Sequence, residues 1–244
     1  MRVRLTSHSA PIVFVVDDDI SMRESLELLF LSAGWQVATF GSAHDFLRQP
    51  RVVAPSCLVL DVALPDINGL ELQKRLMIDR ADLPIIIVTG YGDVPMAVEA
   101  MKSGALEFFM KPFRSTAILD AVGRALERSR ELLTEAAELR SLEARHALLT
   151  RREREVMTLI AAGRMNKQAA VALGISEITV KAHRGRVMRR MQAGSLAELV
   201  MMAERLQHDG TTVTTLRASR DLGAGGLGSR PRSTPGGEAA TQSV

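Results

Sequence analysis

The chain has 244 residues, of which 46% are hydrophobic, so it holds enough apolar material for more than one core and two domains are expected. Its one cysteine, Cys57, excludes an internal disulfide, and the N-terminus lacks the apolar stretch of a secretory signal. No segment is long and apolar enough to span a membrane, so the sequence predicts a cytoplasmic protein with no membrane partner.

The net charge of +3 conceals an asymmetry along the chain. Residues 11–114 hold 9 Lys and Arg against 14 Asp and Glu, a balance of −5, whereas residues 150–208 hold 11 against 5, a balance of +6. A basic second half favours contact with a polyanion such as nucleic acid. Residues 209–244 are rich in Thr, Gly and Ser and poor in large apolar side chains, which predicts a disordered tail.

The first half alternates apolar runs with helical patterns, which predicts parallel strands joined by helices. Strands are expected over residues 12–16, 57–60, 84–88 and 106–110, with a weaker strand over 36–40. Helices are expected from a capping box at Ser21–Glu24 up to Gly34, over 69–79 and 94–103, and from Ser115 onward. These elements predict an α/β fold, a doubly wound five-stranded parallel sheet with Cys57 buried in one strand.

Polar side chains follow four of these strands. The triplet Asp17–Asp19 follows the first, Asp61 the third, Thr89 the fourth and Lys111 the last. The carboxyl ends of parallel strands meet at one edge of the sheet, where ligands bind in such folds. Carboxylates at that edge suit Mg²⁺, and Asp61 could accept a phosphoryl group while the metal and Lys111 offset the charge of its oxygens.

Taken singly, these residues have simpler explanations. The triplet Asp17–Asp19 could cap the next helix, Asp61 could belong to a turn before Pro65, and Lys111 could lie in a loop. Their joint order at successive strand ends favours a shared site, because unrelated turns rarely produce it.

Residues 115–147 carry regularly spaced leucines among many Glu and Arg, which allows one continuous amphipathic helix. This helix could pair with a second chain as a coiled coil. Ser129 and Ala136 interrupt a strict heptad, so a solvated linker helix is the simpler interpretation.

The second half predicts four helices. The first begins at a Thr150 cap with Glu153 three residues on, and the others cover residues 166–173, 177–191 and 195–206. The short turn between the second and third predicts a helix-turn-helix. On the third helix, one face is expected to pack against the other helices; it carries Val180, His183, Val187 and Met191. His183 is expected to be packed and hydrogen-bonded there. The opposite face is Ile178, Ala182, Gly185 and Arg189, with Lys181 and Arg186 beside it.

Four motifs in the first half resemble the receiver domain of bacterial two-component response regulators: residues 15–19, 60–69, 88–105 and 111–113. The likeness implies that Asp61 is the phospho-acceptor. It also implies a Mg²⁺ site of Asp17, Asp18, Asp61 and the Ala63 carbonyl, with Asp18 bound directly and Asp17 through water.

The same likeness implies that Thr89 and Phe108 are the hydroxyl and aromatic switch positions. Lys111 matches the phosphoryl-binding lysine, whose bond to the following proline is often cis in that family. Departures from the pattern at Ala63, Leu64 and Tyr91 bear on dephosphorylation rate or surface contacts and leave the phosphorylation assignment intact.

The second half resembles the four-helix DNA-binding domain of the LuxR, NarL and FixJ group in residues 149–156, 163–167, 173–176 and 179–184, and the whole chain resembles the FixJ-like subgroup. The likeness implies groove-reading positions at Lys181, Ala182 and Gly185. It implies backbone contacts from Lys167, Thr179 and Arg184, and the basic residues Arg186 and Arg189 complete the expected DNA surface. Gly185 offers no side chain to a base, which leaves the sequence preference open.

Together these likenesses predict a phosphorylation-controlled transcription regulator and not an enzyme. The expected partners are a sensor histidine kinase, promoter DNA, RNA polymerase and, on phosphorylation, a second copy as a homodimer. The expected parts are a receiver domain over 11–125, a linker helix over 115–147, the DNA-binding domain over 148–208 and the tail over 209–244.

Two alternatives belong to other classes. A phosphohydrolase of the haloacid-dehalogenase type would use an Asp-x-Asp pair, which Asp17 and Asp19 could supply, or Asp61 as its nucleophile. A constitutive DNA-binding protein would use the receiver only for dimerisation.

Overall fold

The computed structural model describes residues 10–207, so the prediction of a disordered tail over 209–244 lies outside the described residues. The chain divides into two compact units, Met1–Arg140 and Ser141–Val244. This division falls within the segment expected as a linker helix, and the limits proposed for the individual domains stay predictions. Within the described part, no helix combines the length and the apolar character needed to cross a membrane.

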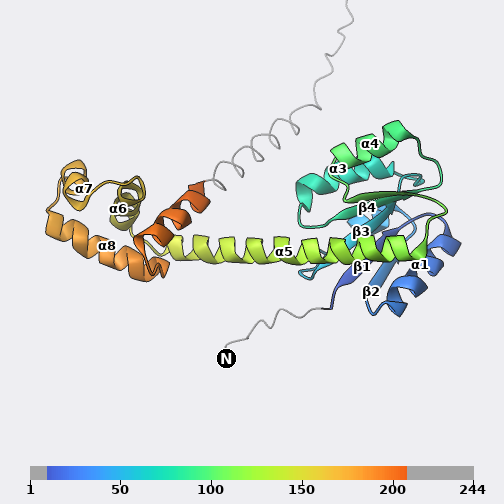
Figure 1. Cartoon of the computed structure of the whole chain (residues 1–244), viewed down its shortest axis with the longest axis horizontal. Coiled ribbons are helices and arrows are strands. Elements are labelled where there is room, and N and C mark those ends of the chain that lie inside the picture. The colour runs from blue at the N-terminus through green and yellow to red at the C-terminus, as the bar shows by residue number, and fades with distance from the viewer. Residues whose placement is uncertain (1–9, 208–244) are drawn as a thin grey trace, which may run out of the picture. The chain divides into compact units, whose positions relative to one another are not determined.

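The first unit is built on the predicted five-stranded parallel sheet (Figure 1). Its strands are β1 (Ile12–Val16), β2 (Gln36–Phe40), β3 (Ser56–Asp61), β4 (Ile85–Thr89) and β5 (Glu107–Met110). They are arranged in the order β2-β1-β3-β4-β5, and every neighbouring pair is parallel. All carboxyl ends therefore lie at one edge, and the order reverses next to β1, where β1 and β3 are neighbours.

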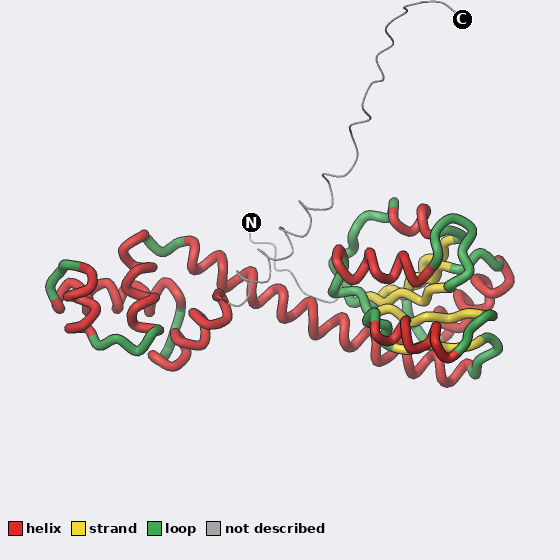
Figure 2. Tube along the Cα trace, turned by 90° about the horizontal axis from the view of Figure 1, so that it is seen from above, coloured by secondary structure: helices red, strands yellow, loops and turns green. Residues whose placement is uncertain are grey.

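Helices cover both faces of this sheet, whose strands are drawn in yellow in Figure 2. They are α1 (Ile20–Ser32), α2 (Ala43–Leu47), α3 (Gly69–Asp79), α4 (Val94–Lys102) and α5 (Ser115–Ala147). Alternate strand residues supply two cores: Val13, Val15 and Val59 pack with α1 and α5, whereas Leu58 and Leu60 pack with the other three helices. Cys57 is fully buried as expected, and burial raises the pKa of its thiol.

Two helix assignments need correction. The predicted capping box at Ser21 is wrong, because α1 begins earlier and Asp19 caps it by accepting hydrogen bonds from the backbone N–H groups of Ser21 and Met22. The sequence interpretation also lacked α2, a helix of five residues that begins after a Ser42 cap. A helix this short shows too few turns to produce a clear hydrophobic period.

The serine that interrupts the heptad pattern of α5 has a structural partner. Ser129 is buried; its hydroxyl accepts a hydrogen bond from the Ser56 N–H and donates one to the Asp82 carbonyl, each over 3.0 Å. The side chain thus satisfies two backbone groups at the amino ends of β3 and β4. This part of α5 belongs to the receiver core.

The second unit has the four predicted helices. They are α6 (Arg151–Ala161), α7 (Asn166–Leu173), α8 (Glu177–Met191) and a helix over 196–207. Thr150 and Glu153 form the predicted capping box of α6. Val180, Val187 and Met191 are buried on one face of α8, as predicted, and Leu142 near the end of α5 joins the core of this unit.

Candidate functional site

Three carboxylates meet beyond the ends of β1 and β3. Asp17 and Asp61 are buried at 0% and 4% exposure, whereas Asp18 is exposed. One carboxylate oxygen from each lies within 4.8 Å of the others. Asp19 does not belong to this cluster, because its side chain caps α1. The structure therefore brings together the three acidic residues expected to bind metal and excludes the Asp17–Asp19 pair that a haloacid-dehalogenase mechanism would need.

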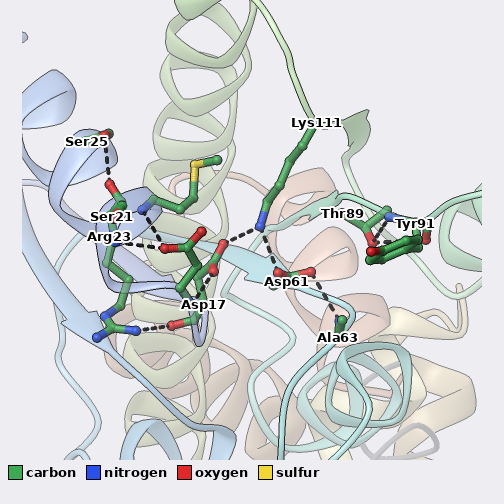
Figure 3. A network of polar contacts seen from close by, with 11 residues as sticks. Asp17, Ser21, Arg23, Ser25, Asp61, Ala63, Thr89, Tyr91 and Lys111 are labelled. Carbon is green, nitrogen blue, oxygen red and sulfur yellow. Dashed lines mark hydrogen bonds and ion pairs between the residues drawn. The ribbon is translucent and has the colours of Figure 1, made fainter.

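Lys111 reaches this cluster from the end of β5 (Figure 3). Its Nζ lies 2.6 Å from Asp17 Oδ2 and 2.8 Å from Asp61 Oδ2, and the Lys111–Pro112 peptide bond is cis. Burial lowers the pKa of Lys111, but the hydrogen bonds and charges of the two carboxylates outweigh it and hold that pKa above its usual value. The lysine is therefore a fixed positive charge between two carboxylates at neutral pH.

Asp17 shows the opposite balance. Burial raises the pKa of this carboxyl more than the hydrogen bonds from Lys111 and Asp19 lower it. A cation close to Asp17 would compensate for this desolvation, and Lys111 supplies the positive charge in this structure.

The loop after β3 fixes the orientation of Asp61. Its Oδ1 accepts a hydrogen bond of 3.1 Å from the Ala63 N–H, while Oδ2 faces Lys111 (Figure 3). Gly69 closes this loop, since a Cβ at that position would lie 2.1 Å from the Asp61 carbonyl oxygen. Any larger residue would displace the backbone that carries Asp61.

Thr89 and Phe108 lie near each other. The Thr89 hydroxyl is not hydrogen-bonded to the carboxylates. The buried Thr89 hydroxyl donates to the Tyr91 carbonyl at 3.0 Å and accepts from the Tyr91 N–H at 3.2 Å. Phe108 is half-buried against the core of this face. Both side chains lie beside Gly92, where a Cβ would lie 3.1 Å from each of them. The hydroxyl expected to bond a phosphoryl group therefore bonds its own loop in this structure.

Two residues near the site escaped the sequence interpretation. Arg23 of α1 donates a hydrogen bond of 2.6 Å to the Asp17 carbonyl. Asp66, in the β3–α3 loop, accepts from the Ala43 N–H, the His44 N–H and the His44 ring at 3.2, 2.8 and 2.6 Å. Burial raises the pKa of Asp66, but these bonds outweigh it and lower that pKa to about 2. Since Ala43 and His44 lie more than twenty residues away in the chain, no local motif reveals these partners.

The residues expected to bind DNA lie on the surface of the second unit. On α8, the side chains of Lys181, Ala182, Arg186 and Arg189 are exposed, and Arg184 and Gly185 are half-exposed. Lys181 Nζ lies 3.4 Å from Glu177 Oε1. Lys167 is exposed on α7, and exposed Thr179 shares a hydrogen bond of 2.8 Å with the Ser176 hydroxyl. The structure thus presents all eight expected contacts to solvent in whole or in part.

The structure does not show the predicted hydrogen bond at His183 Nδ1. The ring is half-buried beside the core, but its Nδ1 is buried without a hydrogen-bond partner in the described part of the chain. The polar network of this unit is instead centred on Glu153, which is 1% exposed and forms an ion pair with Arg190 of α8. Burial raises the pKa of Glu153, but the Thr150 hydrogen bonds and the Arg190 charge outweigh it and lower that pKa.

The chain matches the family described as "Response regulator receiver domain" over residues 13–123 and the family described as "Bacterial regulatory proteins, luxR family" over residues 147–203. Nodulation protein W of Bradyrhizobium diazoefficiens is 50% identical over 195 residues, which cover 80% of this chain and 86% of that protein. The transcriptional regulatory protein FixJ of the same organism is 42% identical over 193 residues, covering 79% and 94%.

The solved structure of the response regulator StyR superimposes with a TM-score of 0.71 at 45% identity and covers 81% of this chain and 100% of that one. These matches overturn the phosphohydrolase alternative. The chain belongs to the two-component response regulators that join a receiver domain to a LuxR-family DNA-binding domain, a family of transcription regulators and not of enzymes.

Proposed function

We propose that Asp61 accepts a phosphoryl group from a phosphohistidine of a sensor histidine kinase and that this modification controls DNA binding. The observation that carries the proposal is the set of charges at one sheet edge: Asp61 Oδ2 faces the Lys111 ammonium, with Asp17 and Asp18 beside it. Such a set has the parts that phosphoryl transfer needs, a nucleophilic oxygen and positive charge for the transferred group.

The donor set fits a Mg²⁺ ion. Asp17, Asp18 and Asp61 offer hard oxygen ligands within a few ångströms of each other, and the exposure of Asp18 leaves room for waters and a phosphoryl oxygen. We propose the Ala63 carbonyl as a further ligand. When bound, the ion would neutralise charge on the oxygens of the transferred group.

The proposed transfer is a single displacement at phosphorus. An Asp61 carboxylate oxygen forms the new P–O bond as the P–N bond to the kinase imidazole breaks, and the imidazole nitrogen takes the electron pair and a proton. Lys111 stays charged and pairs with an oxygen of the aspartyl phosphate. On phosphorylation the carboxylate charge of Asp61 is lost, and the phosphoryl group brings a charge of about −1.5 to −2 in its place.

This added charge would draw the Thr89 hydroxyl away from Tyr91 and toward the phosphoryl oxygens. Phe108 follows into the space that Thr89 leaves, because both side chains lie beside Gly92, which has no side chain to block the movement. The surface of α4, β5 and the start of α5 then changes, and we propose that it forms a homodimer. A shift of this equilibrium from 1:99 to 99:1 needs about 5.5 kcal/mol of differential stabilisation.

In the second unit, we propose that α8 enters the major groove of promoter DNA in the cytoplasm and that the bound dimer contacts RNA polymerase. Lys181, Ala182 and Gly185 face the bases. The expected contacts to the DNA backbone are Lys167, Thr179, Arg184, Arg186 and Arg189.

The test compares DNA affinity before and after treatment with Mg²⁺ and a small acyl phosphate, using duplexes recovered from a random-sequence pool. We expect the phosphodonor to raise the affinity of the wild type and to leave Asp61→Asn unchanged. Equal affinity of the treated and untreated wild type would instead support the constitutive DNA-binding alternative.

A further inference from the structure

Ile178, at the second position of α8, is 80% exposed although it is a large β-branched residue. Helix α8 packs against its own domain through Val180, Val187 and Met191, which are at most 1% exposed and lie on the opposite face. β-branched residues are also weaker helix formers than most straight-chain residues. Neither core packing nor helix propensity therefore accounts for isoleucine at this position.

Ile178 belongs to an outward face of α8 that carries no charge at its centre from Ile178 to Gly185. Residues four and seven positions later on the same face are Ala182 and Gly185, and Lys181 and Arg186 lie on either side. A Cβ built at Gly185 would meet nothing within 4 Å, so packing within the chain does not require a glycine there. Over these two turns the centre of the face is thus apolar or without a side chain, while its borders are basic. Arg189 follows on the same face further along the helix.

This arrangement matches the chemistry of one base in the major groove. The C5-methyl group of thymine is the apolar feature among the donors and acceptors of the base edges there, and aliphatic side chains recognise it by contact. The first residues of a recognition helix are the ones that reach the base edges. On the basis of the proposed DNA-binding role of α8, we propose that Ile178 and Ala182 contact thymine methyl groups. The missing side chain of Gly185 leaves clearance for the duplex.

The charges around the face favour DNA over a protein as its occupant. Arg186 and Arg189 are exposed on the same side of α8 and would lie opposite phosphates when Ile178 faces the bases. The second half of the chain carries a balance of +6 over residues 150–208, which suits a polyanion.

The experiment uses the full chain and two versions of each recovered duplex, one with thymine and one with deoxyuridine at every thymine position of the site. Deoxyuridine keeps the Watson–Crick edge and removes only the methyl group. Binding is compared for wild type, Ile178→Ala and Ile78→Ala. Ile78 is a matched control because it is an isoleucine of similar exposure, 71%, on α3 of the first unit.

We expect deoxyuridine to weaken wild-type binding by about fourfold for each contacted methyl, equivalent to about 0.8 kcal/mol. Ile178→Ala should lose the part of this difference that Ile178 contributes and keep the part that Ala182 contributes, and Ile78→Ala should keep the full difference. Equal wild-type affinity for both duplexes, or full discrimination by Ile178→Ala, would overturn the inference while leaving the proposed function intact. Failure of the wild type to bind any duplex would overturn the proposed function, and the inference with it.

Discussion

At the scale of single residues, the candidate site is a group of charged side chains, and burial strengthens the electrostatic interactions among them. Lys111 is held between Asp17 and Asp61, whose carboxylates are almost inaccessible to water. The sequence predicted this group, because parallel topology brings successive strand ends together. It did not predict the role of Arg23, which binds the Asp17 carbonyl, or of Asp66, which binds the backbone of a segment that only the folded chain brings near.

Asp66 gives a prediction on pH. Its pKa of about 2 lies below the ordinary aspartate value, so its charged form stabilises the fold above about pH 4, and this stabilisation disappears as the pH falls toward 2. Asp66→Asn should therefore lower the free energy of unfolding at pH 7 by about 1–2 kcal/mol, and the difference from wild type should shrink in acid.

The measurement is urea unfolding at pH 7 and pH 3, followed by the fluorescence of the one tryptophan, Trp35, which lies in the same unit. Asp120→Asn is the control, because it removes an exposed charge from α5. A difference of equal size at both pH values would contradict the assigned role of the Asp66 charge.

At the scale of elements, the sequence predicted each strand and most helices because their hydrophobic periods span several turns or a complete strand. It failed for α2, which is too short, and for the start of α1, where Asp19 competed with Ser21 as the cap. It interpreted Ser129 as a flaw in a heptad, whereas this serine satisfies two backbone groups. The first two differences have local causes, whereas the role of Ser129 arises from tertiary contacts that no local pattern contains.

Two lysines on neighbouring helices should differ in their effect on DNA binding. Lys181 lies near the amino end of α8 and should reach a base edge, such as guanine O6 and N7, whereas Lys167 of α7 should contact phosphate alone. Lys181→Ala should cost about 1–3 kcal/mol on the recovered site and weaken its preference. Lys167→Ala should weaken all duplexes alike and lower the salt slope by about one.

Binding titrations on the recovered and scrambled duplexes at several salt concentrations separate these effects. An equal loss on both duplexes for Lys181→Ala would contradict the placement of Lys181 in the groove.

Gly185 should show opposite effects on stability and on binding. Because a Cβ at this helical position meets open space, Gly185→Ala should stabilise the second unit by about 0.5–1 kcal/mol. The added methyl should weaken DNA binding by removing clearance. Thermal unfolding and DNA titration of the same preparation test both signs, and tighter binding by the variant would contradict the clearance role.

At the scale of the whole molecule, the chain joins an acidic receiver unit to a basic DNA-binding unit. The sequence predicted this organisation from its charge asymmetry and two sets of motifs. It did not predict that the division would fall within α5 at Arg140, because that boundary depends on contacts such as the packing of Leu142 into the second core.

Phosphorylation should change the association state of the molecule. Sedimentation of the unmodified and phosphorylated chain at micromolar concentration should give a monomer and a dimer, because the phosphoryl group biases the switch at Thr89 and Phe108. Asp61→Asn treated in the same way should remain a monomer. Equal masses for the two wild-type forms would argue against dimerisation as the output.

The most direct measurement is the intact mass of the chain after incubation with Mg²⁺ and a small acyl phosphate, compared among wild type, Asp61→Asn and the control Asp66→Asn. We expect one phosphoryl adduct on the wild type and on Asp66→Asn, and none on Asp61→Asn. A full adduct on Asp61→Asn would contradict the assignment of Asp61 as the phospho-acceptor.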